Sequence, residues 1–277
     1  MLKARTMSYF HLTCQALHGL APLRDRDACA DLWARLRARF QAVYATVFMP
    51  NHLHLAMEAD DPEAARIELG RVVAAFAQSR GRRLWNPVAP VAPIADRAKL
   101  RRHIRYILLN PCRARLATDP LEWEWSTHRD VVGAAADSWV DRGEMARLWD
   151  CSSLRLPERF HAYVSGDPSV KVAGTSLPAR VAPERIAASL EQIGRAVMQA
   201  GRLSEEDFFR RGSAARGLAA RLAYQLGGRN QEELARWLRL RERRVRGLLA
   251  AAPVAHEREV VGAVHWIMAN PARFRVE

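Results

Sequence analysis

The chain has few cysteines and no long apolar run, and each absence excludes a class of protein. Its four cysteines, Cys14, Cys29, Cys112 and Cys151, form no CxxC pair, which argues against a disulfide framework and against a cysteine-ligated zinc site. No stretch approaches the roughly 18 uncharged apolar residues of a membrane helix, and the N-terminus lacks the apolar block of a signal peptide. We therefore expect a cytoplasmic protein with reduced cysteines and no membrane partner.

Lysine is also scarce, since three of the 43 basic residues are Lys and the net charge of +13 comes almost entirely from arginine. An arginine-rich and alanine-rich chain can reflect a GC-rich genome, so the total charge alone says little. Its distribution is more informative, because residues 97–115 carry seven basic side chains and no acid. This cluster favours a polyanionic partner such as nucleic acid, although a solvated helix face explains it equally well.

Strand patterns occur three times in the first 100 residues. SYFHLTCQAL has the aromatic and β-branched content of a first strand. VYATVF and HLHLAMEA lie on either side of Pro50-Asn51 and are typical of a β-hairpin. The proline-rich segment WNPVAPVAPI fits a short edge strand or a loop.

Helical spacing of apolar residues separates these strands. It predicts helices over residues 28–40, 62–80 and 97–109, with Asp27 as the N-cap of the first. The third ends at Asn110-Pro111, because a residue that precedes proline is disfavoured in the helical region. Together the pattern predicts an α+β fold in which helices pack on an antiparallel sheet.

The second half of the chain differs in composition. Residues 165–184 are dense in Gly, Pro and Ser and indicate a linker. Beyond it every pattern is helical, so we expect a first domain over residues 1–150, a connector over 151–184 and an all-helical domain over 185–277. Candidate helices of the last domain are residues 185–199, 205–211, 214–226, 231–238 and 242–250.

Two histidines stand on alternate positions of the expected hairpin, in FMPNHLHLAM (residues 48–57). Because strand side chains alternate between faces, His52 and His54 share one face with Glu58, and the leucines between them face the core. The imidazoles are then about 7 Å apart at the backbone, close enough to bind one cation. Two solvent-facing or hydrogen-bonded histidines without a metal are the alternative.

A tyrosine lies on the polar side of the third expected helix, KLRRHIRYILLNP (residues 99–111). Its apolar stripe is Leu100, Ile104, Ile107 and Leu108, the spacing of a helix packed on a core. At 100° per residue Tyr106 falls far from this stripe, beside Arg102, His103 and Asn110. Taken alone this is an ordinary amphipathic surface tyrosine. A phenol next to an amide and several arginines also suits chemistry on a phosphate.

These segments resemble a known family. FMPNHLHLAM is similar to the MPNHxHL motif of single-tyrosine HUH transposases, and RYILLNPCRA resembles the YIxxNPVRAG segment of their REP-associated branch. SYFHLT and EWEWST (residues 122–127) resemble that branch's opening strand and closing motif, so the resemblance covers roughly residues 8–130. Cys112 replaces the usual valine and Arg115 the usual glycine. Asn110 stands where single-tyrosine HUH enzymes often have a glutamine ligand.

The resemblance implies an HUH domain with a ferredoxin-like or RRM-like sheet and a specific chemistry. It implies that His52 and His54 bind a divalent cation, Mg²⁺ or Mn²⁺, and that Tyr106 attacks the phosphate of single-stranded DNA. The product is a 5′-phosphotyrosine and a free 3′-hydroxyl. Because hard cations prefer oxygen ligands, we expect Asn110 as the third ligand. Glu58 and water are alternative ligands, Zn²⁺ is an alternative metal, and His103 is a candidate proton acceptor. The arginines expected to contact DNA here are Arg101, Arg102, Arg105, Arg113 and Arg115.

The helical tail adds a second basic region. Residues 231–238, the sequence RLR and residues 242–250 resemble the helix-turn-helix of bacterial replication initiators and regulators. Arg239 stands in the turn where glycine is usual. Duplex DNA docking competes here with a plain helical bundle that has a basic face. The arginines expected to contact DNA are Arg241, Arg243, Arg244 and Arg246.

Three functions therefore compete. The first is a metal-dependent DNA strand-transfer enzyme that cleaves and rejoins single-stranded DNA near REP-like hairpins in the nucleoid. The second is a non-catalytic DNA-binding regulator that recognises structured or duplex DNA. The third is a protein that binds or cleaves RNA. The sequence does not determine the target hairpin, or whether the chain forms dimers.

Overall fold

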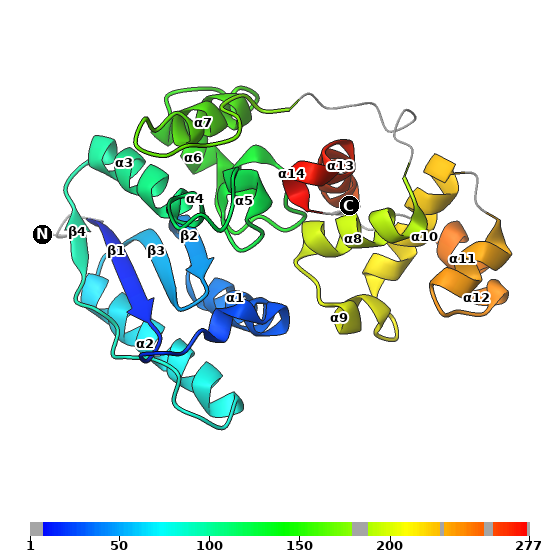
Figure 1. Cartoon of the computed structure of the whole chain (residues 1–277), viewed down its shortest axis with the longest axis horizontal. Coiled ribbons are helices and arrows are strands. Elements are labelled where there is room, and N and C mark those ends of the chain that lie inside the picture. The colour runs from blue at the N-terminus through cyan, green and yellow to red at the C-terminus, as the bar shows by residue number, and fades with distance from the viewer. Residues whose placement is uncertain (1–7, 179–187, 228–229, 252–256, 276–277) are drawn as a thin grey trace, which may run out of the picture. The chain divides into compact units, whose positions relative to one another are not determined.

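The computed structural model describes residues 8–178, 188–227, 230–251 and 257–275 (Figure 1). The chain forms two compact units. The first consists of residues 1–132 and 138–177, and the second of residues 133–137 and 178–277. The first unit therefore extends past residue 150 into the segment expected to be a connector.

A four-stranded sheet forms the centre of the first unit. All its strand pairs are antiparallel and the order is β2-β3-β1-β4. The long hairpin and the first strand are where the sequence predicted them, and the proline-rich segment contributes three residues at one edge. The strands are β1 (Ser8–Gln15), β2 (Val43–Met49), β3 (His52–Ala59) and β4 (Ala92–Ile94).

One face of the sheet packs against α1 (Arg26–Arg39) and α2 (Pro62–Ser79). Apolar residues from neighbouring strands pair on this face, as Leu12 does with Leu55. They join the helix residues Leu32 and Leu69 in a single core. The N-cap of α1 is Asp25, whose side chain accepts from the backbone N–H of Asp27. The expectation that Asp27 caps this helix is therefore wrong by two residues, because α1 begins a half-turn earlier.

The other face of the sheet carries α3 (Arg97–Leu108), which contacts β2 and β3. Leu100, Ile104, Ile107 and Leu108 are all buried, as their spacing predicted. After Leu109 the chain forms one further short helix, α4 (Asn110–Arg113). The unit is completed by 3-10 turns at Pro22–Arg24 and Pro120–Glu122 and by α5 (His128–Val132), α6 (Arg142–Leu148) and α7 (Leu156–Ser165).

The segment EWEWST covers the outer edge of β2. Trp125 O accepts from the backbone N–H of Phe48 at 2.9 Å, Ser126 forms a bridge with Val47, and the backbone N–H of Thr127 donates to Thr46 O at 3.0 Å. The outward-facing backbone groups of Thr46 and Phe48 on this edge strand thereby have partners.

Among its described residues, the second unit contains helices and connecting loops and no strand. The helices α8 and α13 pack together, α10 contacts α8 and α12, and α11 contacts α12. The prediction of an α+β sheet domain followed by helices is thus confirmed. The helices are α8 (Leu190–Gly201), α9 (Glu205–Phe209), α10 (Ala214–Gly227), α11 (Gln231–Trp237), α12 (Glu242–Ala250), α13 (Glu257–Ala269) and α14 (Pro271–Phe274).

The helix expected over residues 185–199 begins later, at Leu190, because Ser189 caps it with extended backbone geometry. Residues 185–187 lie outside the described residues. Across the described helices, none combines the length and the apolar character that crossing a bilayer requires.

Candidate functional site: a histidine cluster facing an exposed tyrosine

The two histidines of the hairpin lie on the sheet face that is turned away from the main core. Their ring centroids are 4.9 Å apart. His54 is 8 % exposed and His52 is half-buried at the end of β3. Leu53 and Leu55 point to the opposite face and are fully buried. The alternation predicted from HLHL is therefore present.

A third histidine, which sequence reasoning did not single out, joins this pair from β1. The register pairs Thr13 with His54 and His11 with Ala56, so His11 is the diagonal neighbour of His54. The two imidazoles are in hydrogen-bond contact, with His11 Nε2 and His54 Nδ1 3.0 Å apart. Thr13 Oγ1 lies 3.2 Å from each of these nitrogens.

Burial keeps these imidazoles neutral. It lowers the pKa of His54 to about 3, with a further contribution from the neighbouring His11 and His52. The pKa of His11 falls to about 4, mainly by burial and also because of His103. Burial lowers the pKa of His52 as well. A neutral imidazole has a nitrogen lone pair that can bind a metal or accept a proton.

Helix α3 presents Tyr106 to this cluster. The side chain is 47 % exposed, and its ring centroid lies 6.3 Å from that of His54. One turn earlier, His103 stands edge-on to His11 with 5.5 Å between centroids. The sheet and α3 therefore bring together the histidines and the tyrosine that the sequence separates by about fifty residues.

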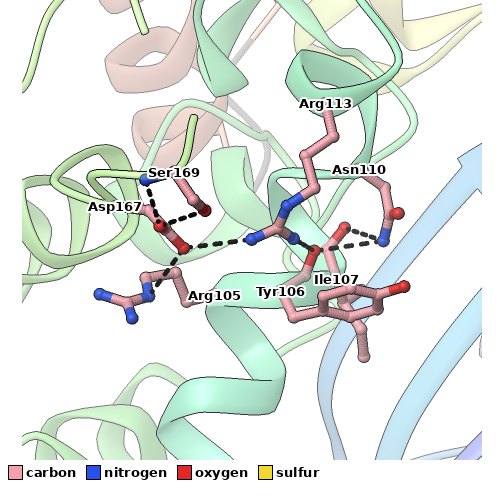
Figure 2. Close-up of polar contacts among 7 residues, drawn as sticks. All are labelled: Arg105, Tyr106, Ile107, Asn110, Arg113, Asp167 and Ser169. Carbon is pink, nitrogen blue, oxygen red and sulfur yellow. Dashed lines mark hydrogen bonds and ion pairs between the residues drawn. The ribbon is translucent and has the colours of Figure 1, made fainter. Parts of the chain in front are cut away.

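The tyrosine is bordered by an amide and a clamped arginine (Figure 2). Asn110 Nδ2 donates to the backbone oxygens of Tyr106 and Ile107, at 3.2 Å each. Arg113 donates from Nη1 to Tyr106 O at 2.9 Å, and its guanidinium lies 4.8 Å from the centroid of the Tyr106 ring. Both residues belong to α4, which begins directly after Leu109 and brings the chain back beside the tyrosine.

Asp167 holds the arginine in place, and sequence reasoning also missed it. Its carboxylate pairs with Arg113 at 3.1 Å and with Arg105 at 3.4 Å (Figure 2). Hydrogen bonds from Ser169 lower the pKa of this carboxyl, and the two arginines lower it further. Asp167 follows α7, beyond the boundary expected at residue 150, so its role depends on a contact that no local pattern indicates.

The other arginines of this region differ in their surroundings. Arg101 pairs with the exposed Asp150 at 3.5 Å, whereas Arg102 is exposed on α3. Arg115 is exposed and has a φ of +57°. Glycine adopts this left-handed conformation without the steric cost that a side chain adds.

The two hairpin histidines supply some of the ligands that a divalent cation needs. His52 Nδ1 lies 2.8 Å from Asn51 Oδ1, a contact that leaves Nε2 as the free nitrogen. The contact between His54 Nδ1 and His11 Nε2 likewise leaves Nε2 of His54 to face a metal. Two neutral imidazoles suit Mn²⁺ or Zn²⁺ better than the oxygen-preferring Mg²⁺.

No third protein ligand is evident. Within the described part of the chain, no group of three or more His, Cys, Asp and Glu side chains is arranged to hold a metal. Glu58 is engaged elsewhere, because its carboxylate accepts from the Tyr44 hydroxyl at 2.8 Å. A protein metal site would therefore need Asn110, water or substrate oxygens beside the two histidines.

The arginines expected in the tail belong to the second unit. Arg241, Arg243, Arg244 and Arg246 are exposed at the start of α12 or on it. Arg239, in the turn between α11 and α12, has a φ of +53°. The turn therefore uses the conformation that makes glycine usual at this position.

Comparison with known proteins yields one similar structure. No family model and no curated protein matches the chain. A solved structure described as a REP-associated tyrosine transposase bound to a REP hairpin is 22 % identical, with a TM-score of 0.38. The alignment covers 45 % of this chain and 79 % of that chain.

Proposed function

We propose that the first unit is a tyrosine-dependent strand-transfer enzyme acting on single-stranded DNA. The single observation that carries this proposal is an exposed Tyr106 ring 6.3 Å from a half-enclosed cluster of neutral histidines. Tyr106 thus stands half-exposed to solvent, with imidazoles on one side and a guanidinium on the other, where a DNA phosphate could reach its hydroxyl.

The chemistry assigned to these residues is a balanced substitution at phosphorus. The phenol oxygen of Tyr106 forms a bond to the phosphorus, the bond from phosphorus to the 3′ oxygen breaks, and the leaving oxygen takes up a proton. The product is a 5′-phosphotyrosine and a 3′-hydroxyl, and the reverse reaction rejoins the strand. The phenol proton needs an acceptor, and His103 is the candidate on the same side of the sheet, because burial lowers the pKa of its neighbour His11 to about 4 and makes that imidazole a poor base.

The surrounding residues position the nucleophile and bind the substrate. Arg113 holds the backbone and ring of Tyr106, while Arg105 and Arg102 supply positive charge along α3 for the DNA phosphates. In this proposal His52 and His54 hold a divalent cation, Mn²⁺ or Mg²⁺, with Asn110 as the candidate third ligand. Such a cation would polarise the scissile phosphate.

The test uses the full-length chain and labelled single-stranded oligonucleotides that carry a hairpin. With Mn²⁺ or Mg²⁺ we expect a covalent protein–DNA adduct that survives denaturation, and its complete loss in Tyr106→Phe. Tyr224→Phe is a matched control, because Tyr224 is also exposed but lies in the second unit.

A non-catalytic binding regulator would give a different result in this test. Tight binding of hairpin DNA that is indifferent to EDTA and to Tyr106→Phe, with no adduct on any strand, would assign the chain as a binding regulator. The third hypothesis, that the chain binds or cleaves RNA, is tested by competition between RNA and DNA hairpins of the same sequence. Preferential binding of the RNA hairpin would support it.

A further inference from the structure

The second unit contains a cavity that the proposed strand transfer does not use. It has a volume of about 1090 Å³ and lies between α10 and α12, with the loop before α10 at one end. Seven arginines and one carboxylate line it. Such a lining gives the cavity a strong excess of positive charge.

Only one of these arginines has a carboxylate inside the cavity. Glu257 forms a two-pronged pair with Arg221, at 2.6 and 2.7 Å, and this pair is largely buried. Arg239 pairs at 3.6 Å with Glu205, which lies outside the lining. The remaining six arginines have no carboxylate partner within the lining itself. They are Arg211, Arg216, Arg239, Arg241, Arg243 and Arg244.

Arg216 is the central observation, because it is a cation held almost out of water. It is 8 % exposed, and it donates only to the backbone oxygens of Phe209, Arg210 and Leu238. Its Nε has no hydrogen-bond partner, and among the described residues no ion pair involves it. Burial, followed by the nearby charges of Arg244 and Arg239, lowers the pKa of Arg216.

A buried cation surrounded by further cations is costly unless an anion compensates it. Several guanidinium groups converging on one space match the oxygens of a phosphate, which accept paired N–H donors. The first turn of α10 lines the same cavity, and the positive end of its helix dipole also favours an anion. The volume suits a nucleotide or a short length of sugar–phosphate backbone better than a single inorganic ion.

We propose that this cavity is a phosphate-binding site, independent of the tyrosine site in the first unit. Its ligand carries at least one phosphate group, either as part of a DNA backbone or as a free nucleotide. The site goes beyond contacts of α12 with DNA, because Arg211 and Arg216 come from the other wall. It would therefore exist even if the first unit proved to have no catalytic activity.

The test measures pyrophosphate binding by titration calorimetry, with the full-length Tyr106→Phe chain at constant ionic strength. Arg211→Gln and Arg244→Gln each remove one exposed cation from the cavity and should weaken binding roughly 5- to 10-fold. Arg236→Gln is the matched control, because Arg236 is exposed on α11 outside the cavity and pairs with Glu232 at 2.9 Å. We expect it to bind pyrophosphate as the parent chain does.

Two further ligands identify the source of the phosphate. If a duplex oligonucleotide displaces pyrophosphate and loses affinity in the same two variants, the ligand is a DNA backbone. If ATP binds more tightly than pyrophosphate and duplex DNA does not compete, the ligand is a free nucleotide. The proposal is overturned if pyrophosphate binding is absent, or if the control variant weakens it as much as the cavity variants do. Thermal melting of each variant verifies that it is folded.

Discussion

Two pairs of histidines in the first unit make the same contact in opposite surroundings. His11 and His54 are joined by ring nitrogens 3.0 Å apart, and so are His128 and His161. The first pair lies beside the exposed Tyr106 and half-buried His52. The second has no exposed surface at all and packs against Phe160. An imidazole pair is therefore not a functional site in itself, since solvent access and a nearby nucleophile distinguish the first pair from the second.

The largest expected contrast separates activity from stability. His54→Ala should lower the rate of adduct formation by at least about 100-fold, because it removes a ligand or donor beside the reacting phenol. His128→Ala should instead lower the free energy of unfolding by about 1–3 kcal/mol, since it removes the buried contact with His161 and leaves a cavity. Adduct assays and urea denaturation of both variants test this. Equal losses of activity in two folded variants would remove the distinction.

The sealed pair should also make stability depend on pH. Burial holds the pKa of His128 well below its ordinary 6.5, and His161 and Arg129 add to this effect. As the pH falls below about 6.5 the unfolded chain takes up a proton that the folded chain refuses. The free energy of unfolding then falls by up to about 1.4 kcal/mol per pH unit. Above pH 6.5 both states hold a neutral His128, so its protonation no longer changes the stability.

His128→Gln removes this titration while keeping a polar side chain. Urea denaturation between pH 7.5 and 5 should show a shallower loss of stability in the variant than in the parent. Identical slopes would mean that His128 is not kept neutral by the fold.

A smaller effect is expected at the rim of the open site. Asp167→Asn removes the negative charge that partly neutralises Arg105 and Arg113, so the positive potential that DNA phosphates meet at this rim becomes stronger. Affinity for single-stranded DNA should rise about 2- to 5-fold at low salt, and less at high salt. Asp150→Asn is the control, because Asp150 is 64 % exposed and its pairs are longer. Fluorescence anisotropy that shows no difference between the two variants would contradict a clamping role for Asp167.

The smallest expected effect concerns the backbone just after the site. Arg115→Gly relieves a left-handed conformation and should stabilise the chain by up to about 1 kcal/mol. Arg102→Gly, in the middle of α3, should destabilise it by about 1 kcal/mol. Thermal melting compares the two directly, and a loss of stability in both would show that the Arg115 side chain contributes more than its strained backbone costs.

Periodic patterns predicted much of the first unit. The alternation in HLHL assigned the leucines to the core, and the helical stripe of Leu100, Ile104 and Ile107 left Tyr106 exposed. Both inferences depend only on local geometry, which the backbone imposes on any sequence. The tail's helices followed from the same kind of pattern.

Contacts between distant segments could not be predicted. His11 reaches His54 only through the register of β1 and β3, and a one-residue slip would turn it to the other face. Asp167 reaches Arg113 across 54 residues of sequence. Arg216 looks like any surface arginine in its sequence context, yet the loop before α10 and the end of α11 enclose it. In each case tertiary packing, which has no local signature, creates the chemistry.

The way EWEWST lies along β2 limits how two copies of this chain could associate. Trp125 to Thr127 occupy the hydrogen-bonding edge that a neighbouring molecule would need to extend the sheet. The opposite edge is the three-residue β4, whose central residue is Pro93 and therefore offers no amide hydrogen there. A symmetric dimer built by joining two sheets into one is thus disfavoured.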